Sequence, residues 1–213
     1  MDIDYRRSAF LAVDVQNDFC PGGALAVADG DAVASVVNRL APLFPVCVAT
    51  QDWHPAGHVS FATTHPGKVP YDAAEPGLDG RATTLWPDHC VQDSPGAAFH
   101  PRLDERPFNF IVRKGSRQDL DSYSAFFEND GATVTGLDGL LRGLGVDTVV
   151  LAGLAFDYCV FYSAMDARRL GYKVVVVVDA TRPVDAPPGN ATNAEAQLRQ
   201  AGVSLVQSAE LLG

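Results

Sequence analysis

The sequence predicts a three-layer α/β/α fold in which helices cover both faces of a six-stranded, mostly parallel sheet. Short, nearly continuous apolar runs rich in β-branched residues recur along the chain, as strands buried on both faces of a parallel sheet do. Stretches with helical periodicity separate these runs, which is typical of βαβ units. The chain has 213 residues, of which 47% are hydrophobic and 20% charged, enough to bury a sizeable core without a disulfide or metal.

The predicted strands and helices alternate in chain order. The predicted strands are 8–13, 46–50, 108–112, 148–152, 173–178 and, with a weaker pattern, 203–207. The predicted helices are 31–43, 137–144, 158–170 and 191–201. Gly145 and Gly171 follow two of the helices, where a left-handed cap suits glycine.

Residues 52–106 break this alternation, because they are rich in proline and glycine and contain few periodic segments. A structureless segment of this length is unusual in a compact domain, and long ordered loops on an α/β scaffold often carry function. The segment also holds all five histidines, which are His54, His58, His65, His89 and His100. We therefore predict one domain over residues 1–213, with a loop-rich insertion at 52–106 that carries a metal site.

Composition excludes several classes of function. With 16 Lys and Arg against 26 Asp and Glu, the formal charge is −10, so binding to nucleic acid or to an anionic membrane surface is not expected. The longest strongly apolar stretch, 174–178, is far shorter than a membrane helix. Arg6 and Arg7 precede an apolar run as in a twin-arginine signal, but Asp14 interrupts it, so we interpret the run as the first strand.

The four cysteines lie far apart without paired spacing, which favours a reducing, cytoplasmic location over a disulfide framework. No phosphate-loop or dinucleotide fingerprint follows the first predicted strand, so no bound NAD is expected. The expected partner is a small molecule, and the chain is expected to be a monomer or a homo-oligomer.

Four chemically useful residues stand at the carboxyl ends of predicted strands. Asp14 ends the first strand and Asp52 follows the second. Lys114 ends the third, and Cys159 begins the helix after the fourth. Because the carboxyl ends of parallel strands meet at the edge of the sheet where ligands bind, we expect these side chains to lie close together.

Asp14, Lys114 and Cys159 form a candidate catalytic group. A free thiol has a pKa near ~8.5, and a neighbouring cation and a helix N-terminus both lower that pKa. Lys114 supplies the cation, and Asp14 can take the thiol proton and later pass it to a leaving group. Taken singly, such an aspartate is usually a turn residue, such a cysteine a small core residue and such a lysine solvent-exposed. Their coincidence at one edge favours the catalytic interpretation.

Asp52, His54 and the distant His89 form a candidate metal site, with His58 as a possible further ligand. Alternate residues of an extended segment point the same way, so Asp52 and His54 can face one ion. Imidazole and carboxylate suit one divalent zinc, iron or manganese ion, and three protein ligands leave positions open. The alternative, that these histidines only pack and form hydrogen bonds, stays open at this point. Phe19, Trp53, Trp86 and Tyr123 can stack on a flat ring, although aromatic residues are core residues by default.

Six segments of the chain resemble the nicotinamidases, a group within the isochorismatase-like cysteine hydrolases. They are DVQNDFCPGG at 14–23, QDWHPAGHVSF at 51–61, LWPDHCVQ at 85–92, KG at 114–115, DSYSAF at 121–126 and GLAFDYCV at 153–160. The resemblance runs from about residue 8 to residue 207. The WPDHCVQ and DWHP blocks make it specific, because they mark nicotinamidases within the superfamily.

The resemblance implies an isochorismatase-like hydrolase fold and metal-dependent hydrolysis of nicotinamide to nicotinate and ammonia through a thioester, as in NAD salvage, with pyrazinamide as a further substrate. It implies that Cys159 is the nucleophile, Asp14 the general acid–base and Lys114 the cation that stabilises both charges. It also implies that Asp52, His54 and His89 bind the ion, with His58 a direct ligand in some relatives.

The resemblance further implies an oxyanion hole made by the backbone N–H groups of Ala155 and Cys159, with a cis peptide between Leu154 and Ala155. Phe19 and Trp86 are expected to clasp the substrate ring, with Tyr123, Leu154 and Ala155 also in the substrate site.

Three departures from the family pattern leave the substrate range open. Phe156 stands where many relatives have threonine, Asp93 where a small or neutral residue is common, and Pro183 where glycine is frequent. Three other functions remain as alternatives. A related amidase for carbamoyl or ureido compounds generally lacks the metal ligands, and an isochorismatase proper lacks the cysteine. A metal-binding or nicotinamide-sensing domain would bind without releasing ammonia.

Overall fold

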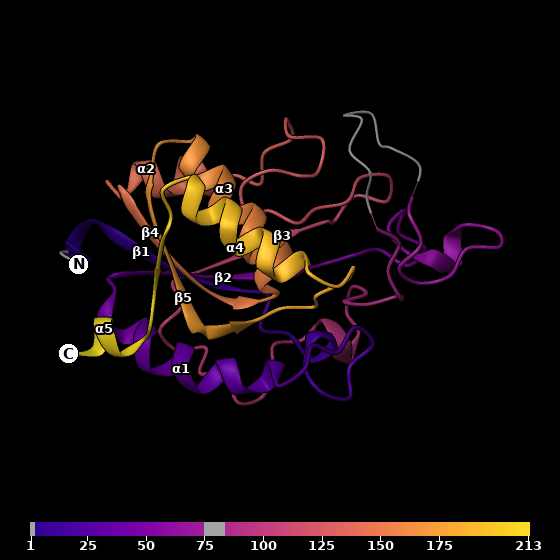
Figure 1. The fold of residues 1–213 in the computed structure, drawn as a ribbon, viewed down its shortest axis with the longest axis horizontal. Coiled ribbons are helices and arrows are strands. Elements are labelled where there is room, and N and C mark those ends of the chain that lie inside the picture. The colour runs from indigo at the N-terminus through magenta and orange to yellow at the C-terminus, as the bar shows by residue number, and fades with distance from the viewer. Residues whose placement is uncertain (1–2, 75–83) are drawn as a thin grey trace.

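The computed structural model describes residues 3–74 and 84–213, in which a six-stranded sheet lies between two layers of helices (Figure 1). The strands are β1 (Ser8–Val13), β2 (Val46–Asp52), β3 (Phe110–Lys114), β4 (Thr148–Leu154), β5 (Lys173–Arg182) and β6 (Ser204–Val206). All neighbouring strands are parallel, in the order β3-β2-β1-β4-β5-β6. The three-layer fold and its six predicted strands are therefore confirmed.

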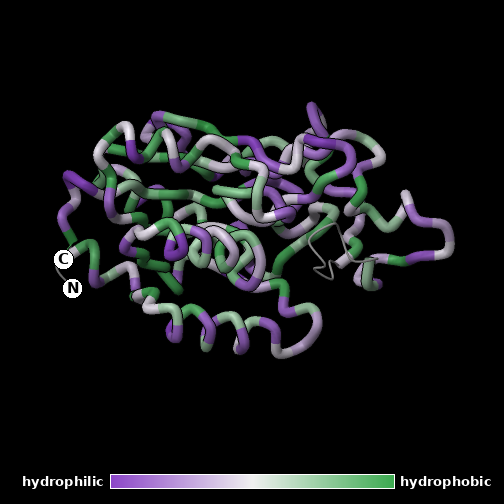
Figure 2. The backbone as a smooth tube through the Cα atoms, turned by 90° about the horizontal axis from the view of Figure 1, so that it is seen from above, coloured by the Kyte–Doolittle hydropathy of each residue, from purple (hydrophilic) through white to green (hydrophobic). Residues whose placement is uncertain are grey.

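The central strands form because their side chains are apolar on both faces. Every residue of β1 and β4 is buried, as expected for strands covered by helices on both sides. The edge strand β3 instead alternates between half-buried and exposed residues until the buried Lys114. Figure 2 shows that hydrophobic residues gather along the middle of the molecule, where the sheet lies.

Helices cover the two faces of the sheet unequally. On one side lie α1 (Val33–Leu40) and α5 (Ala209–Leu212), and on the other α2 (Leu137–Gly143), α3 (Phe161–Arg169) and α4 (Asn190–Gln200) (Figure 1). The helix predicted over 31–43 is a shorter α-helix, α1, with a 3-10 turn at each end, Gly30–Ala32 and Ala41–Leu43. Pro42 lies in the second turn, and its missing N–H cannot continue the α-helical hydrogen bonds. Within the described residues, no helix has the length and apolar character that crossing a bilayer requires.

The bounds of several predicted elements differ in the structure, and β2 and β4 each end two residues later than predicted. β3 begins two residues later than predicted, because the Asn109 side chain accepts the N–H of Cys47 where a strand residue would pair. β5 continues to Arg182, past the predicted end at 178. The predicted helix over 158–170 begins as a separate π-helical turn, Phe156–Val160, before α3.

The described part of segment 52–106 is mostly irregular, as predicted, with short 3-10 turns at Ala62–Thr64 and Pro95–Ala97. Pro76, Gly77 and Gly80, which contribute to that prediction, lie outside the described residues.

The order in which strands are added to the sheet reverses between β1 and β4. From β1 it proceeds to β2 and β3 on one side, and then returns to build β4, β5 and β6 on the other. Ligands of open α/β sheets bind where the strand order reverses, beyond the carboxyl ends of the two strands. Val13 pairs with Gly153 at the end of this central strand pair, so the residues after β1 and β4 lie next to each other.

Gly153 generates a testable prediction about the central strand pair. It has a φ of 114°, and a Cβ atom there would overlap the backbone carbonyl oxygen of Val13. We expect Gly153→Ala to lower the free energy of unfolding by about 3 kcal/mol or more, because backbone cannot move aside as a flexible side chain can. Chemical denaturation measures this change.

Gly139→Ala is the matched control, because nothing lies within 4 Å of a Cβ at this position in α2. It should raise the free energy of unfolding by roughly 0.5–1 kcal/mol. Equal unfolding midpoints for the two variants would contradict the prediction.

Candidate active site

A narrow pocket, partly open to solvent, lies beyond the carboxyl ends of the central strands. Side chains from segments far apart in the sequence line it. They are Phe19, Leu25, Asp52, His54, Trp86, His89, Asp121, Ser122, Tyr123, Ala155, Tyr158, Cys159 and Val184. The pocket therefore contains the predicted nucleophile, the predicted metal ligands and the predicted ring-binding aromatic residues.

The structure brings the predicted catalytic group together. The Sγ atom of Cys159 lies 3.4 Å from Nζ of Lys114, and this Nζ lies 2.9 Å from Oδ2 of Asp14. Asp14 follows β1, Lys114 ends β3, and Cys159 lies in the turn after β4. Asp14 and Lys114 are fully buried, while Cys159 retains 5% exposure in the pocket wall.

Asp14 is held by a side chain of the neighbouring strand. Thr50, in β2, donates its hydroxyl to Oδ1 of Asp14 at 2.5 Å and accepts the Asp14 N–H at 3.1 Å. The other oxygen, Oδ2, contacts Lys114 but has no well-directed hydrogen bond in the described part of the chain. A carboxylate oxygen of Asp14 lies within 4.8 Å of the Cys159 sulfur. Asp14 is thus placed to exchange a proton with the thiol.

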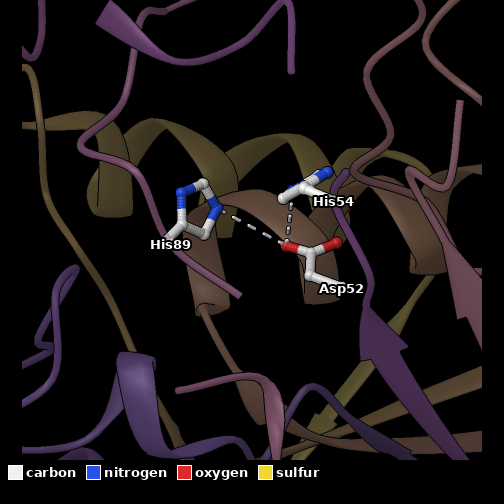
Figure 3. A group of neighbouring side chains, drawn as sticks. All are labelled: Asp52, His54 and His89. Carbon is white, nitrogen blue, oxygen red and sulfur yellow. Dashed lines mark ion pairs between the residues drawn. The ribbon is translucent and has the colours of Figure 1, made fainter. Parts of the chain in front are cut away.

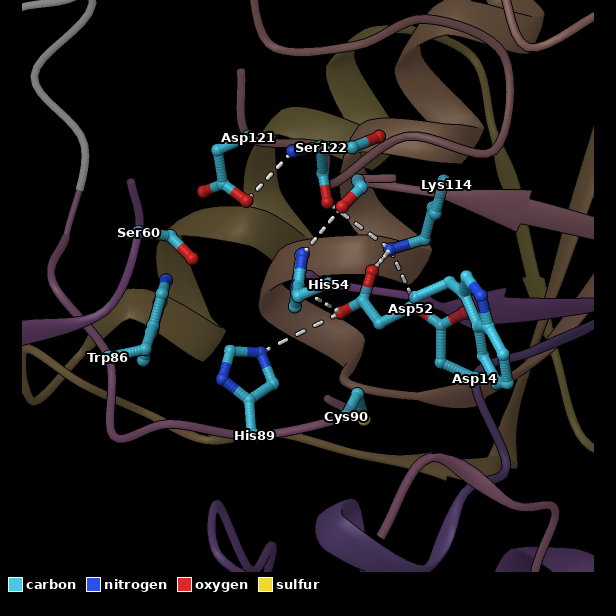
Figure 4. Close-up of polar contacts among 12 residues, drawn as sticks. Asp14, Asp52, His54, Ser60, Trp86, His89, Cys90, Lys114, Asp121 and Ser122 are labelled. Carbon is cyan, nitrogen blue, oxygen red and sulfur yellow. Dashed lines mark hydrogen bonds and ion pairs between the residues drawn. The ribbon is translucent and has the colours of Figure 1, made fainter. Parts of the chain in front are cut away.

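Lys114 joins this group to the candidate metal ligands. Its ammonium group forms a very short ion pair with Oδ1 of Asp52 and donates to the Ser122 carbonyl at 3.3 Å (Figure 4). Burial lowers the pKa of Lys114, but the two carboxylates outweigh it and raise the pKa well above its usual value. Lys114 therefore remains charged.

The predicted lowering of the Cys159 pKa is wrong for this structure. Burial raises the pKa of the thiol well above its ordinary value, and the charges of Asp14 and Asp52 add to this effect. Lys114 acts in the opposite direction but does not overcome burial. Burial also raises the pKa of Asp14, against the influence of Lys114. The resting thiol is therefore protonated and needs a base at the moment of attack.

The turn that carries Cys159 begins with the predicted cis peptide between Leu154 and Ala155. Ala155 and Cys159 both line the pocket, whereas Leu154 is fully buried, is not part of the described pocket wall and packs near Gly30. Phe156 is also buried and outside the described pocket wall.

Aromatic side chains form one wall of the pocket. Trp86 donates its Nε1–H to the Tyr123 hydroxyl at 3.1 Å, and Tyr158 packs edge-on against Trp86 at 4.8 Å. The ring of Phe19 packs edge-on against the ring of His89, with their centroids 5.5 Å apart. Phe19, Trp86 and Tyr123 are thus in the pocket as predicted.

Sequence reasoning missed several lining residues. Tyr158 could have been found from its place beside Cys159. Leu25, Asp121, Ser122 and Val184 belong to irregular segments without a periodic signal, and only the tertiary structure brings them here.

The predicted metal ligands converge on a single point (Figure 3). Oδ2 of Asp52 lies 3.7 Å from Nε2 of His54 and 3.8 Å from Nε2 of His89. The remaining ring nitrogens are engaged elsewhere: Nδ1 of His54 donates to the Gly115 carbonyl at 2.9 Å, and Nδ1 of His89 to the Pro87 carbonyl at 2.8 Å. These hydrogen bonds leave both Nε2 atoms facing the common point, which is how proteins orient metal-binding histidines.

The donor set fits one divalent cation. Burial raises the pKa of Asp52, but Lys114 and His54 outweigh burial and hold it well below the usual range, so the carboxylate is ionised. One carboxylate oxygen and two imidazole nitrogens suit zinc, iron or manganese.

His58, predicted as a possible further ligand, lies behind His54 and not beside Asp52. Its ring stacks on His54 at 4.2 Å, and Nε2 donates to the Leu120 carbonyl at 3.1 Å. Nδ1 lies 2.7 Å from the Ser60 hydroxyl and 3.3 Å from the Ser60 N–H, so it acts as an acceptor. Both ring nitrogens are therefore occupied by protein groups. Burial and the charge of His54 lower the pKa of His58 to about 4, which keeps it neutral.

Comparisons with known proteins identify the family of the chain. The isochorismatase domain family matches residues 8–210. The nicotinamidase of Escherichia coli (strain K12) is 45% identical over 206 residues, which cover 95% of each chain. A solved Acinetobacter baumanii structure, described as a nicotinamidase and pyrazinamidase, is 46% identical with a TM-score of 0.94, covering 97% of this chain and 99% of that one. A pyrazinamidase of Pyrococcus horikoshii in complex with zinc is 34% identical with a TM-score of 0.76, covering 94% and 99%.

Gly115 generates a prediction about metal affinity. Its φ is 63°, and a Cβ atom there would overlap the ring of His54. We expect Gly115→Ala to lower the affinity for zinc by about 10- to 100-fold, because His54 must leave its metal-binding orientation. Competition with a chromophoric chelator measures this affinity without any assay of activity.

Gly145→Ala is the control for backbone strain alone. Gly145 also has a positive φ, of 73°, but nothing lies within 4 Å of its Cβ position. Zinc affinity close to wild type in this variant, with a loss in Gly115→Ala, supports the orientation of His54. An equal loss in both would refute it.

The lowered pKa of His58 generates a prediction about stability. The unfolded chain, with a histidine pKa near 6.5, takes up a proton that the folded chain refuses until about pH 4. His58 therefore stabilises the fold above pH 6.5, and this contribution is lost as the pH falls toward 4. Between pH 7 and pH 5 we expect its loss to lower the free energy of unfolding by about 2 kcal/mol.

Urea denaturation of the metal-free chain at both pH values measures this loss. In His58→Gln, which has no titrating group at this position, the difference between the two pH values should shrink by about the same amount. An unchanged difference would show that His58 does not resist protonation.

Proposed function

The chain belongs to the isochorismatase family, and we propose that it is a metal-dependent cysteine amidohydrolase that converts nicotinamide to nicotinate and ammonia. One observation carries this proposal: Cys159, with Asp14 and Lys114 behind it, shares a pocket with aromatic rings and a convergent donor set for a divalent ion. A flat, neutral heteroaromatic amide fits this combination, because its ring can pack against Phe19 and Trp86 while its carbonyl carbon faces the thiol. The named activities of the relatives support the same substrate.

Proton transfer to Asp14 starts the proposed reaction. Asp14 removes the thiol proton of Cys159, and the sulfur bonds to the amide carbon while Lys114 stabilises the developing charges. The backbone N–H groups of Ala155 and Cys159 donate to the oxyanion, each contributing about 3 kcal/mol in comparable sites. Asp14 then returns the proton to the amine as the C–N bond breaks, which releases ammonia and leaves a thioester.

Hydrolysis of the thioester uses the same groups. Asp14 takes a proton from a water molecule, whose oxygen attacks the thioester carbon, and the proton goes back to sulfur as nicotinate leaves. Thiol and carboxylate thus return to their resting states. A divalent ion held by Asp52, His54 and His89 supplies a Lewis-acid contact for the substrate when bound.

Related properties follow from the same site. We propose pyrazinamide as a further substrate, because it is also a flat heteroaromatic amide and relatives of this chain are named pyrazinamidases. The bound ion is proposed to be zinc, iron or manganese, and residues 1–213 to form one domain that acts as a monomer or homo-oligomer. The charge of −10 supports a small neutral substrate rather than nucleic acid. The four free, buried cysteines support a reducing, cytoplasmic setting.

Ammonia release from nicotinamide by the metal-loaded protein tests the proposal. We expect Cys159→Ala to reduce turnover by on the order of 10³-fold or more, because the bond-forming atom is lost. Chelation of the metal should also reduce turnover, and readdition of zinc, iron or manganese should restore it.

Cys47→Ala is the matched control, because Cys47 is also free and buried but lies in β2, away from the pocket wall. It should keep turnover within about threefold of wild type. Absence of ammonia from nicotinamide in the metal-loaded wild type would refute the proposal and leave carbamoyl and ureido compounds as the next substrates to test.

A further inference from the structure

Asp157 is a buried carboxylate that the proposed reaction does not use. It is 2% exposed and lies in the Phe156–Val160 turn, two residues before the nucleophile. No Lys or Arg in the described ranges forms an ion pair with it; N–H groups surround it instead. Oδ1 accepts the Val184 N–H at 2.9 Å, and Oδ2 accepts the Asp185 N–H at 2.9 Å and the Asn190 side-chain amide at 3.1 Å.

These donors belong to residues 183–190, which are the loop between β5 and α4 together with Asn190, the first residue of α4. The turn holds the same loop at a second point, since the Tyr158 hydroxyl donates to the Ala186 carbonyl in a very short hydrogen bond. Asp185 in turn accepts the Gly189 and Ala191 N–H groups at 3.0 Å each, so the loop is continuous with the start of α4.

Little apolar burial holds this loop in place. Five of its residues are exposed, namely Pro183, Asp185, Pro187, Pro188 and Gly189. The position of the loop therefore depends on its hydrogen bonds to Asp157 and Tyr158. A carboxylate that receives three N–H donors gives the strongest hydrogen bonds available to a loop of this kind.

The loop contributes to the pocket through Val184, which lines it together with Ala155, Tyr158 and Cys159. The N–H of Val184 is the group that Oδ1 of Asp157 accepts. One carboxylate thus connects the turn that carries Cys159 to the part of the pocket wall that Val184 forms.

We propose that Asp157 is a positioning residue that fixes loop 183–190 against the nucleophile turn, so that Val184 forms a defined wall for the substrate ring. The role in substrate binding rests on the proposed function, while the role in holding the loop does not. Asp157 touches neither the substrate nor the reacting atoms, and its effect falls on binding more than on the chemical step.

Asp157→Asn tests this proposal. Both carboxylate oxygens of Asp157 accept N–H groups, so the NH2 group of asparagine would face an N–H donor in place of one acceptor. We expect amide hydrogen exchange at Val184 and Asp185 to accelerate by about tenfold or more, as loss of one or two hydrogen bonds permits. KM for nicotinamide should rise by about tenfold, with kcat within about threefold of wild type.

Asp179→Asn is the matched control. Asp179, in β5, also accepts two hydrogen bonds, from the Ser208 N–H at 2.7 Å and its hydroxyl at 2.6 Å, but it is not part of the pocket wall. Exchange at Val184 and Asp185 and the KM should stay at wild-type values in this variant.

Wild-type exchange at Val184 and Asp185 in Asp157→Asn would overturn the proposal, as would faster exchange spread evenly through β1 and β4. A wild-type KM alongside loosened loop amides would overturn the role in substrate binding alone. If the wild type released no ammonia from nicotinamide, the proposed function would fail, but the exchange result would still decide whether Asp157 holds the loop.

Discussion

The buried ammonium group of Lys114 is the interaction on which the site depends. It lies between the carboxylates of Asp14 and Asp52 and 3.4 Å from the Cys159 sulfur, and none of the three charged side chains is more than 4% exposed. Removing one partner of a buried charge pair leaves an uncompensated charge that is costly to bury. Here the loss of Lys114 would leave two. The ends of β1, β2 and β3 are therefore held together by charge as well as by the sheet.

Asp52 connects the two halves of this site. Its Oδ1 pairs with Lys114, while its Oδ2 faces His54 and His89. The charge of Asp52 also raises the pKa of Cys159. A cation at Oδ2 would offset part of that negative charge, so the candidate metal site and the thiol would be electrostatically coupled through Asp52.

The sequence could predict those parts of the fold and site that follow from strand ends. The continuous apolar runs predict the strands, and the polar residues after them then meet at one edge because the sheet is parallel. Roles that depend on tertiary partners could not be predicted. Both ring nitrogens of His58 are occupied, by the Ser60 hydroxyl and the Leu120 carbonyl, and local spacing in the sequence does not predict these contacts.

The pKa of Cys159 also could not be predicted from the sequence. The cation beside Cys159 was predictable, but the extent to which desolvation outweighs it was not, because burial is a property of the completed pocket. The helix α5 was also not predictable, because it has only four residues and no periodicity. Val184 was missed as a pocket residue because its place depends on a tertiary hydrogen bond from its N–H to Asp157.

The origin of the metal ligands has a consequence for how the molecule folds. Asp52 and His54 come from the end of β2, whereas His89 comes from a separate loop whose next residue, Cys90, donates its N–H to Asp18 at 2.7 Å. The unfolded chain holds no such donor set, so an ion that binds there binds the native state alone and shifts the folding equilibrium by mass action. The free energy of unfolding would thus rise with the concentration of the ion.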